Sequence, residues 1–315
     1  MRLATYTHKR HAGAPRAGVV QGDRIIDVAG LLGGDTPVDL LGLLDRGPDA
    51  LESLRAAAGR FEEEFRDALH VPQELAVPAW EAKLLSPLPR PRSLRDFYAF
   101  EQHVRAANER RGRSVPAAWY EVPVFYFAYA GSIYGPDDRV PKPTTTNELD
   151  FELELACVIG KSGRNIPADD ALSHVAGFTV LNDWSARDTQ RQEMSVGLGP
   201  AKGKDFATSL GPYVVTPEDM ADRFMDGRHD LTMIARINGE EVSRGNAKDL
   251  HWTFAQMIER ASQDVELSPG DVIGSGTVGG GCLLELGEQV HPWLQTGDEV
   301  ELEIERLGRL RNTIV

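Results

Sequence analysis

The stretch Leu149-Asp-Phe-Glu-Leu-Glu-Leu-Ala-Cys-Val-Ile-Gly160 decides the fold class. Its alternation and its closing glycine are typical of a β-strand. Because side chains alternate between the two faces of a strand, Glu152 and Glu154 share one face and Phe151 lies on the other. An ordinary half-exposed strand would begin in the same way. The run continues as Cys-Val-Ile, however, which indicates burial on both faces, and two carboxylates that enter a core repel each other unless a cation or a proton intervenes.

The chain around this strand is rich in further strand signals. Turn signals at Pro269-Gly-Asp271 and Thr296-Gly-Asp298 are each followed by β-branched and aliphatic residues. Helical stretches are few after residue 86. We therefore expect a strand-rich α+β architecture for residues 86–315.

A proline-rich segment, Ser86-Pro-Leu-Pro-Arg-Pro-Arg92, separates this part from the N-terminal residues. Because proline interrupts both helices and central strands, this segment is the best linker in the chain. Residues 1–85 are expected to form a small separate unit, with strands over 3–6, 17–20 and 24–28 and a helix over 51–69.

Composition excludes several classes of protein. The chain has 315 residues and a net charge of −14, and it has no basic cluster that could hold a nucleic acid backbone. Cys157 and Cys282 are far apart in apolar surroundings, which argues against a disulfide framework or a zinc site. No apolar run is long enough for a signal peptide or a membrane span, so a cytoplasmic location is predicted.

A third region of interest runs from Ser93 to Gly112. A possible helix start at Ser93, a stop at Gly112 and apolar residues at intervals predict a single helix. Asp96 and His103, seven residues apart, would then share one face of it. The alternative is that Asp96 belongs to a capping box with Ser93 and that His103 is a surface or core residue.

A further acid follows the strand over 177–181, in Asn182-Asp-Trp-Ser-Ala-Arg-Asp-Thr-Gln190. If this segment is helical, Asp183, Arg187 and Gln190 lie on one face. The alternative is an N-capping Asp183 with a surface Asp/Arg pair. Together with the earlier acids, Asp183 would complete an all-oxygen shell suited to Mg²⁺ or Ca²⁺ rather than to Zn²⁺, made of Asp96, Glu152, Glu154 and Asp183.

The glycine-rich run Gly274-Ser-Gly-Thr-Val-Gly279 matches the GxGxxG pattern of dinucleotide-binding proteins and follows a predicted strand. The residues after it, Gly280-Gly-Cys-Leu-Leu-Glu285, do not open a helix in the way that this fingerprint requires. A dinucleotide site is therefore not expected here.

Taken together and in this order, these motifs resemble the fumarylacetoacetate hydrolase family over roughly residues 86–290. The resemblance rests on Asp96-Phe-Tyr98, Gln102-His103, Tyr126 within 119–126, Glu152-Leu-Glu154, Asn182-Asp183 through Gln190, Gly203-Lys204 through Thr208, Gly276-Thr277 and Gly281 through Glu285. It implies a mixed β-roll with a small N-terminal domain, assembled as a homodimer.

The resemblance also implies an activity: hydrolysis of a carbon–carbon bond in a small dioxo acid such as fumarylacetoacetate or an acylpyruvate, of the kind found in aromatic amino acid catabolism. The cofactor would be Mg²⁺, or Ca²⁺ or Mn²⁺. The implied metal residues are Asp96, Glu152, Glu154, Asp183, Lys204 and Thr208. The implied substrate contacts are Tyr98, Tyr126, Arg187, Gln190 and Thr277, and the implied catalytic groups are His103, Glu285, Lys204, Arg187 and Gln190.

One residue departs from the hydrolase branch of that family. Met194 stands where the branch has a substrate-contacting tyrosine, four residues after Gln190. Other chemistries of the same family remain alternatives, namely oxaloacetate decarboxylation and hydroxydienoate isomerisation or hydration. A further alternative is an inactive relative that binds a metal or a small acid without turnover. His103 and Glu285 together favour activation of water.

Overall fold

The computed structural model describes residues 1–34, 38–65, 71–72, 75–110 and 112–315. Most of the strands in this part join one twelve-stranded sheet, and five more form a second sheet. The prediction of a strand-rich α+β fold is confirmed. Among the described residues, no helix is both long and apolar enough to cross a bilayer.

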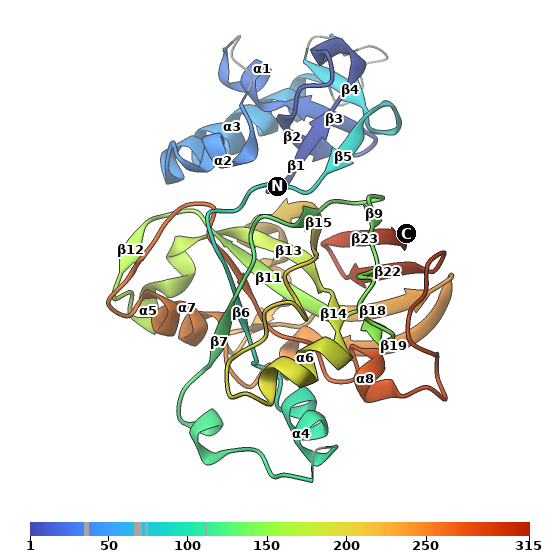
Figure 1. Cartoon of the computed structure of the whole chain (residues 1–315). Coiled ribbons are helices and arrows are strands. Elements are labelled where there is room, and N and C mark those ends of the chain that lie inside the picture. Colours follow the sequence, from blue (N-terminus) through green and yellow to red (C-terminus); the bar gives the residue numbers. More distant parts are fainter. Residues whose placement is uncertain (35–37, 66–70, 73–74, 111) are drawn as a thin grey trace.

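The large sheet runs along the whole molecule (Figure 1). Its strands, in spatial order, are β4 (Ala76–Pro78), β3 (Arg24–Asp27), β2 (Arg16–Gln21), β1 (Arg2–Thr7), β15 (Thr208–Val215), β13 (Val175–Asp183), β11 (Leu153–Ile159), β21 (Val272–Gly274), β6 (Leu94–Phe97) and β7 (Phe125–Ala128), with β5 (Lys83–Leu85) beside β1 and β8 (Ile133–Tyr134) beside β15.

The second sheet packs against the first and closes the core of the main body. Its order is β19 (Glu240–Asn246), β18 (Thr232–Ile237), β22 (Glu299–Ile304), β23 (Gly308–Ile314) and β9 (Arg139–Val140). Three short strand pairs complete the strands of the described part: β10 (Leu149–Asp150) with β14 (Ser185–Ala186), β12 (Gly163–Arg164) with β20 (Glu266–Leu267), and β16 (Phe224–Met225) with β17 (Arg228–His229).

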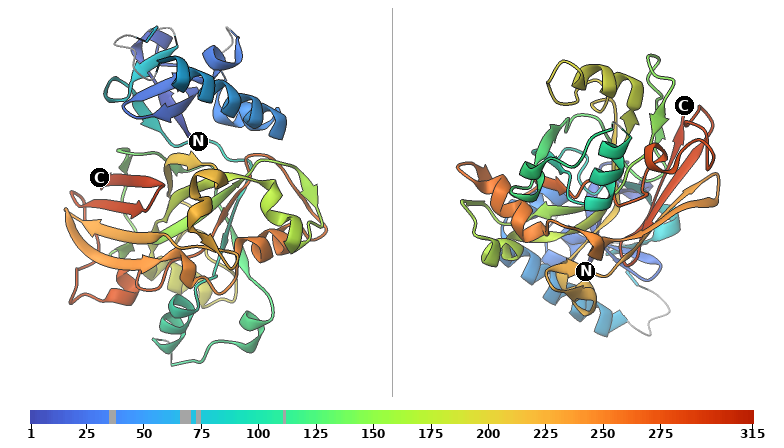
Figure 2. Two further views of the ribbon diagram at one scale, coloured as in Figure 1. Left: turned by 180° about the vertical axis from the view of Figure 1, so that it is seen from behind. Right: turned by 90° about the horizontal axis from the view of Figure 1, so that it is seen from below.

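The helices lie at the two ends and along the sides of these sheets (Figures 1 and 2). Helices at the N-terminal end are α1 (Val28–Leu32), α2 (Leu40–Leu44) and α3 (Pro48–Phe65). Those of the main body are α4 (Glu101–Glu109), α5 (Ala168–Ala171), α6 (Arg187–Met194), α7 (Phe254–Ser262) and α8 (Leu283–Leu286). In the left view of Figure 2, α4 and the N-terminal helices lie at opposite ends of the molecule.

The N-terminal residues continue the large sheet. Strand β1 pairs with β15, with Leu3 opposite Val214. The predicted strands over 3–6, 17–20 and 24–28 correspond to β1, β2 and β3, although Val28 already belongs to α1. The predicted helix over 51–69 corresponds to α3, and its last four predicted residues lie outside the described part. The domain boundary at residues 85/86 stays a prediction.

Strand β11 is buried on both faces, as its sequence indicated. One face places Phe151, Leu153 and Leu155 in the larger hydrophobic core, which also contains Leu302 of the second sheet. The other face places Ala156 in the core that it shares with the N-terminal residues. The face that carries Glu152 and Glu154 therefore points into a desolvated region.

The prediction of one helix over 93–112 is wrong. Residues 94–97 form strand β6, and helix α4 starts only at Glu101. Strand β6 pairs in parallel with β21, with Gly274 opposite Asp96, and all its residues are buried. The Ser93 hydroxyl donates to Asp271 at 2.6 Å, so it does not form the alternative capping box either. Pairing with a strand about 180 residues away in sequence overrides the local helical pattern.

Candidate active site

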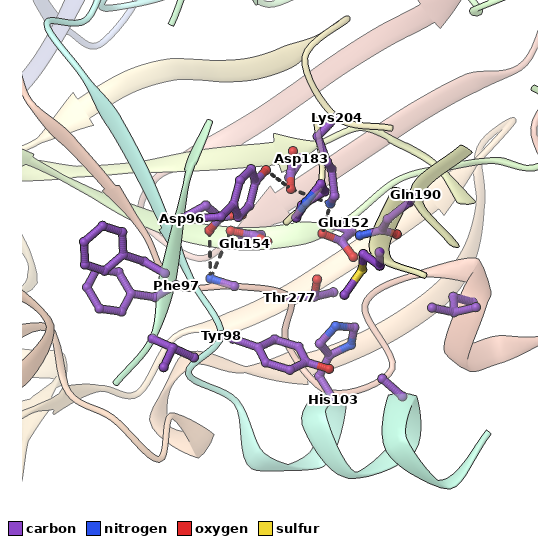
Figure 3. A pocket seen from close by; sticks show the side chains of 18 of the residues that line it. Asp96, Phe97, Tyr98, His103, Glu152, Glu154, Asp183, Gln190, Lys204 and Thr277 are labelled. Atoms are coloured by element: carbon purple, nitrogen blue, oxygen red, sulfur yellow. Dashed lines mark hydrogen bonds and ion pairs between the residues drawn. The ribbon is translucent and has the colours of Figure 1, made fainter. Parts of the chain in front are cut away.

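Four carboxylates meet at the centre of the main body. They come from β6, from the start of β11 and from the end of β13, and one oxygen of each lies within 4.8 Å of the others. All four side chains are buried (Figure 3): Asp96, Glu152, Glu154 and Asp183. The four acids that were singled out in the sequence are thus brought together.

Strand register explains why they meet. In the antiparallel pair β11–β13, Leu153 lies opposite Asn182, so the acids next to these two residues are neighbours. Asp183 reaches this position as the last residue of β13, because α6 begins only at Arg187. The expectation that Asp183 shares a helix face with Arg187 and Gln190 is therefore wrong.

The glycine-rich run after β21 makes room for two of the acids. A Cβ atom on Gly274 would lie 2.5 Å from an Asp96 oxygen and 3.1 Å from a Glu154 oxygen. The Gly276 amide donates to the same two carboxylates, at 3.2 and 3.1 Å. The run that matched GxGxxG is followed by a three-residue loop over 280–282, and the short helix α8 then begins at Leu283. The expectation that residues 280–285 do not open a helix is therefore wrong for Leu283 to Glu285. The role of the glycine-rich run beside the acids was not foreseen from the sequence.

The cluster holds more negative charge than its own cations neutralise. Burial raises the pKa of Asp96 well above its usual range, and Asp183 raises it further. Burial and the Asp96 charge do the same to the pKa of Glu154. For Asp183, burial raises the pKa against the opposing effect of Lys204. Unless a cation binds, some of these carboxyl groups must therefore be protonated.

Two cations lie on one side of the cluster. The Lys204 ammonium donates to Glu152 at 2.7 Å and also to Asp183. Arg187 donates to Glu152 at 2.7 Å and to Asp150 at 2.8 Å. Burial opposes ionisation of Glu152, but Lys204 and Arg187 outweigh it and hold the Glu152 pKa below its usual range.

Two buried oxygens of the cluster lack any hydrogen-bond partner among the described residues: Glu154 Oε1 and Asp183 Oδ1. A buried carboxylate oxygen without a donor is costly, and a hard divalent cation is the group that oxygen-only ligands suit. The residues present therefore fit a divalent metal. Tyr126 supports this end, since its hydroxyl donates to the other oxygen of Asp183 at 2.7 Å.

A histidine and a glutamate form the opposite end of the site. His103, on α4, bonds through Nδ1 to the Glu285 carboxylate on α8, and both side chains are nearly buried. Because a carboxylate only accepts hydrogen bonds, the Nδ1 atom carries a proton, and in the neutral imidazole Nε2 is then an acceptor. The Gly280 amide donates to the second Glu285 oxygen at 3.0 Å, and the Tyr98 ring lies edge-on to His103 with centroids 5.2 Å apart.

Both ends face one cavity of about 220 Å³. Figure 3 shows the acids and Lys204 on one side, and Tyr98 and His103 on the other, with Thr277 between them. The Thr277 hydroxyl is buried without a hydrogen-bond partner among the described residues. The rest of the lining is largely apolar: Phe97, Ala107, Val124, Phe125, Met194, Pro200 and Leu284.

Not every predicted residue reaches this cavity. Gln190 lines it and accepts a bond from Arg187 at 3.1 Å. Thr208 lies opposite Asp183 in the sheet but does not line the cavity. Glu285 contacts His103 and does not line the cavity. The roles assigned to these residues stay predictions.

Sequence reasoning missed two acids. Asp150 accepts from the Leu283 and Leu284 amides at 2.7 and 3.0 Å, and it orients Arg187. Its place just before the Glu152/Glu154 pair was the only available signal. Glu193 accepts from three amides over 201–203 and so closes the loop that carries Met194 and Pro200. No sequence pattern predicted that contact.

Comparison with known proteins shows which family the chain belongs to. The family model "Fumarylacetoacetate (FAA) hydrolase C-terminal" matches residues 93–315. A human protein named oxaloacetate tautomerase FAHD2A, mitochondrial, is 42% identical over 195 residues, which are 61% of this chain and 59% of the relative. The 2,4-didehydro-3-deoxy-L-rhamnonate hydrolase of Sphingomonas sp. (strain SKA58) is 35% identical over 195 residues, 61% of this chain and 65% of the relative. The chain thus spans less than two thirds of the length of each.

A solved structure shows the same fold over the whole chain. Maleylpyruvate hydrolase from Sphingobium sp. SYK-6, in complex with manganese(II) and pyruvate, is 26% identical, with a TM-score of 0.70. The match covers 100% of this chain and 99% of that one.

Proposed function

Because the chain belongs to the fumarylacetoacetate hydrolase family, we propose that it is a metal-dependent hydrolase that cleaves a carbon–carbon bond in a small dioxo acid. One observation carries the proposal: His103, which is bonded to Glu285, and the four-carboxylate cluster line the same cavity. A general base and a hard-metal site in one small cavity are what water attack on a chelating oxo acid requires.

The end of the cavity that carries the four carboxylates and Lys204, called the metal end below, would hold the 2-oxo acid part of the substrate. A divalent cation on Asp96, Glu152, Glu154 and Asp183 would supply Lewis-acid polarisation of that part. Mg²⁺, Mn²⁺ and Ca²⁺ all suit oxygen ligands, and a related solved structure contains manganese. Lys204 neutralises two of the acids and donates from the cavity wall, so it is also placed to stabilise negative charge on a substrate oxygen.

The opposite end, where His103 is bonded to Glu285, is called the base end below and would activate water. His103 Nε2 takes a proton from water while Glu285 stabilises the imidazolium that forms. The hydroxide adds to the carbonyl carbon remote from the metal end. The tetrahedral adduct then breaks its bond to the methylene carbon, and the electron pair leaves as the enolate of a 2-oxo acid. That carbon recovers a proton, so one water is consumed and the products are two acids.

The apolar wall favours an uncharged distal group. The cations among the described lining residues, Arg187 and Lys204, are each already bonded to two carboxylates. Met194, Pro200 and Leu284 offer no counter-charge to a second substrate carboxylate. An acylpyruvate with a short alkyl tail therefore fits better than a dicarboxylate such as fumarylacetoacetate.

The human relative's name favours a second candidate, oxaloacetate tautomerisation. That reaction moves a proton between carbon and oxygen and needs a base but no attacking water. The discriminating experiment is an assay of acylpyruvates, fumarylacetoacetate and oxaloacetate side by side with Mg²⁺. Release of a carboxylic acid from an acylpyruvate that depends on His103 supports hydrolysis. Keto–enol exchange of oxaloacetate without cleavage of any dioxo acid would replace the proposal by the tautomerase.

The assembly and location belong to the same proposal. A homodimer and a cytoplasmic location are expected, and the human relative's name places that protein in mitochondria. Light scattering of the purified chain measures the assembly directly.

A further inference from the structure

A second group of potential metal ligands lies at the base end of the cavity. One ligand atom each from His103, Cys282 and Glu285 lies within 4.8 Å of the others. This group contains a nitrogen and a sulfur donor, whereas the four-carboxylate cluster contains oxygen alone. Sulfur and imidazole ligands select a softer cation than Mg²⁺, and Cys, His and Glu are all established zinc ligands. The sequence argued against a zinc site because Cys157 and Cys282 are far apart in apolar surroundings, but this group uses Cys282 alone.

The spacing of the three ligands is close to that of a zinc site. The Cys282 sulfur lies 3.7 Å from Glu285 Oε1. Zinc bonds of about 2.3 Å to sulfur and 2.1 Å to oxygen, at a tetrahedral angle, separate the two ligand atoms by about 3.6 Å. The His103–Glu285 contact has to widen from a hydrogen bond to about 3.4 Å when zinc replaces the proton between them. The third pair, a ring nitrogen of His103 and Cys282 Sγ, lies within 4.8 Å.

The surroundings also suit a metal. Cys282 and His103 are buried, at 0% and 5% exposure, so water does not compete for the thiol. The Gly280 amide holds the second oxygen of Glu285, which orients the first.

We propose that His103 Nδ1, Cys282 Sγ and Glu285 Oε1 form an inhibitory Zn²⁺ site, separate from the four-carboxylate cluster. Binding displaces the thiol proton to solvent and moves the Nδ1 proton of His103 to Nε2. With a proton on Nε2 and the metal on Nδ1, the imidazole can no longer accept a proton from water. The inhibition rests on the proposed function, because it acts by removing the base; the binding of the metal does not.

The binding test uses Co²⁺ as a spectroscopic substitute for Zn²⁺, added to the full chain in saturating Mg²⁺. We expect a thiolate-to-cobalt charge-transfer band with one Co²⁺ per chain, abolished by excess Zn²⁺. The band should be lost in Cys282→Ala and in Cys282→Ser. It should remain in Cys157→Ala, which removes the other thiol, equally buried within β11 but outside both ligand groups.

The inhibition test measures turnover at fixed saturating Mg²⁺ with increasing Zn²⁺. Zn²⁺ should inhibit the wild type and Cys157→Ala alike, and at least tenfold more Zn²⁺ should be needed for the two Cys282 variants, which keep their Mg²⁺-dependent turnover. Turnover also reports that these variants are folded.

The outcomes separate the two proposals. If the wild type gives no band, or if the band survives in folded Cys282→Ser, the zinc site does not exist. If the band depends on Cys282 but Zn²⁺ leaves turnover unchanged, the site stands and the role of His103 as the base falls.

Discussion

The two ends of the cavity are built in different ways. The four carboxylates stand at or beside strands β6, β11 and β13, whose backbones are paired on both sides. The His103–Glu285 pair stands instead on two short helices, α4 and α8, outside the sheets. A sheet fixes side-chain positions through hydrogen-bonded neighbours, while short helices depend on a few side-chain contacts. The sheets therefore hold the metal end rigidly, whereas a substitution at the base end should leave the metal end unchanged.

The largest expected effect comes from a change at Glu154, which tests metal binding and the stability of the fold separately. Glu154→Gln should lower turnover by about 10³-fold, because it removes a ligand charge from the cation. It should also abolish metal-induced stabilisation. In chelator, however, the variant should be at least as stable as the wild type, because it replaces a buried acid whose pKa is raised by burial and by Asp96. Thermal unfolding with and without Mg²⁺ measures both quantities, and a strongly destabilised variant in chelator would contradict this account of the cluster.

A change at the base end should leave the metal end intact. His103→Ala should lower turnover by about 10²- to 10³-fold, because no other described group is placed to take the proton. The shift in unfolding temperature on addition of Mg²⁺ should equal that of the wild type. His229→Ala is the matched control, since His229 has the same 5% exposure but lines a different pocket. Loss of Mg²⁺ binding in His103→Ala would show that the two ends are not independent.

The pH dependence of the free energy of unfolding should come from the acids of the metal end. Since the pKa values of Asp96, Glu154 and Asp183 are raised in the folded chain, these acids favour the folded state at pH below their unfolded pKa values. That contribution is lost as pH rises through the raised folded values. The chelated protein should therefore become less stable with rising pH, while Mg²⁺ at about 100 times its Kd adds about 2.7 kcal/mol. The gain from Mg²⁺ should be larger at pH 8 than at pH 5 in denaturant titrations; an equal gain would contradict the raised pKa values.

The smallest expected effect concerns the apolar wall between the two ends. Met194→Ala should lower kcat/KM for acylpyruvates with longer alkyl tails by about tenfold, since a lost methylene contact in an apolar pocket costs about 1–3 kcal/mol. Pyruvates with the shortest tail should be nearly unaffected and serve as the internal control. Equal losses for all tail lengths would place Met194 outside the distal pocket.

Local patterns predicted the metal end well and the base end less well. The period-two pattern of β11 correctly placed Glu152 and Glu154 on one buried face. The helix assigned over 93–112 was wrong for its first residues, since β6 forms by pairing with β21 and β7, which are distant in sequence. Asp96 and His103 therefore belong to different elements, and their common cavity could not follow from a helix face.

The sequence by itself determined the family, the α+β class and the acids that occur beside strands, because these follow from composition, short motifs and the two-residue period of a strand. Only the tertiary structure decided which groups meet. His103 and Glu285 are 182 residues apart, and Cys282 joins them through the loop that follows β21. Such contacts depend on strand order and on the space left by Gly274, which no local pattern encodes.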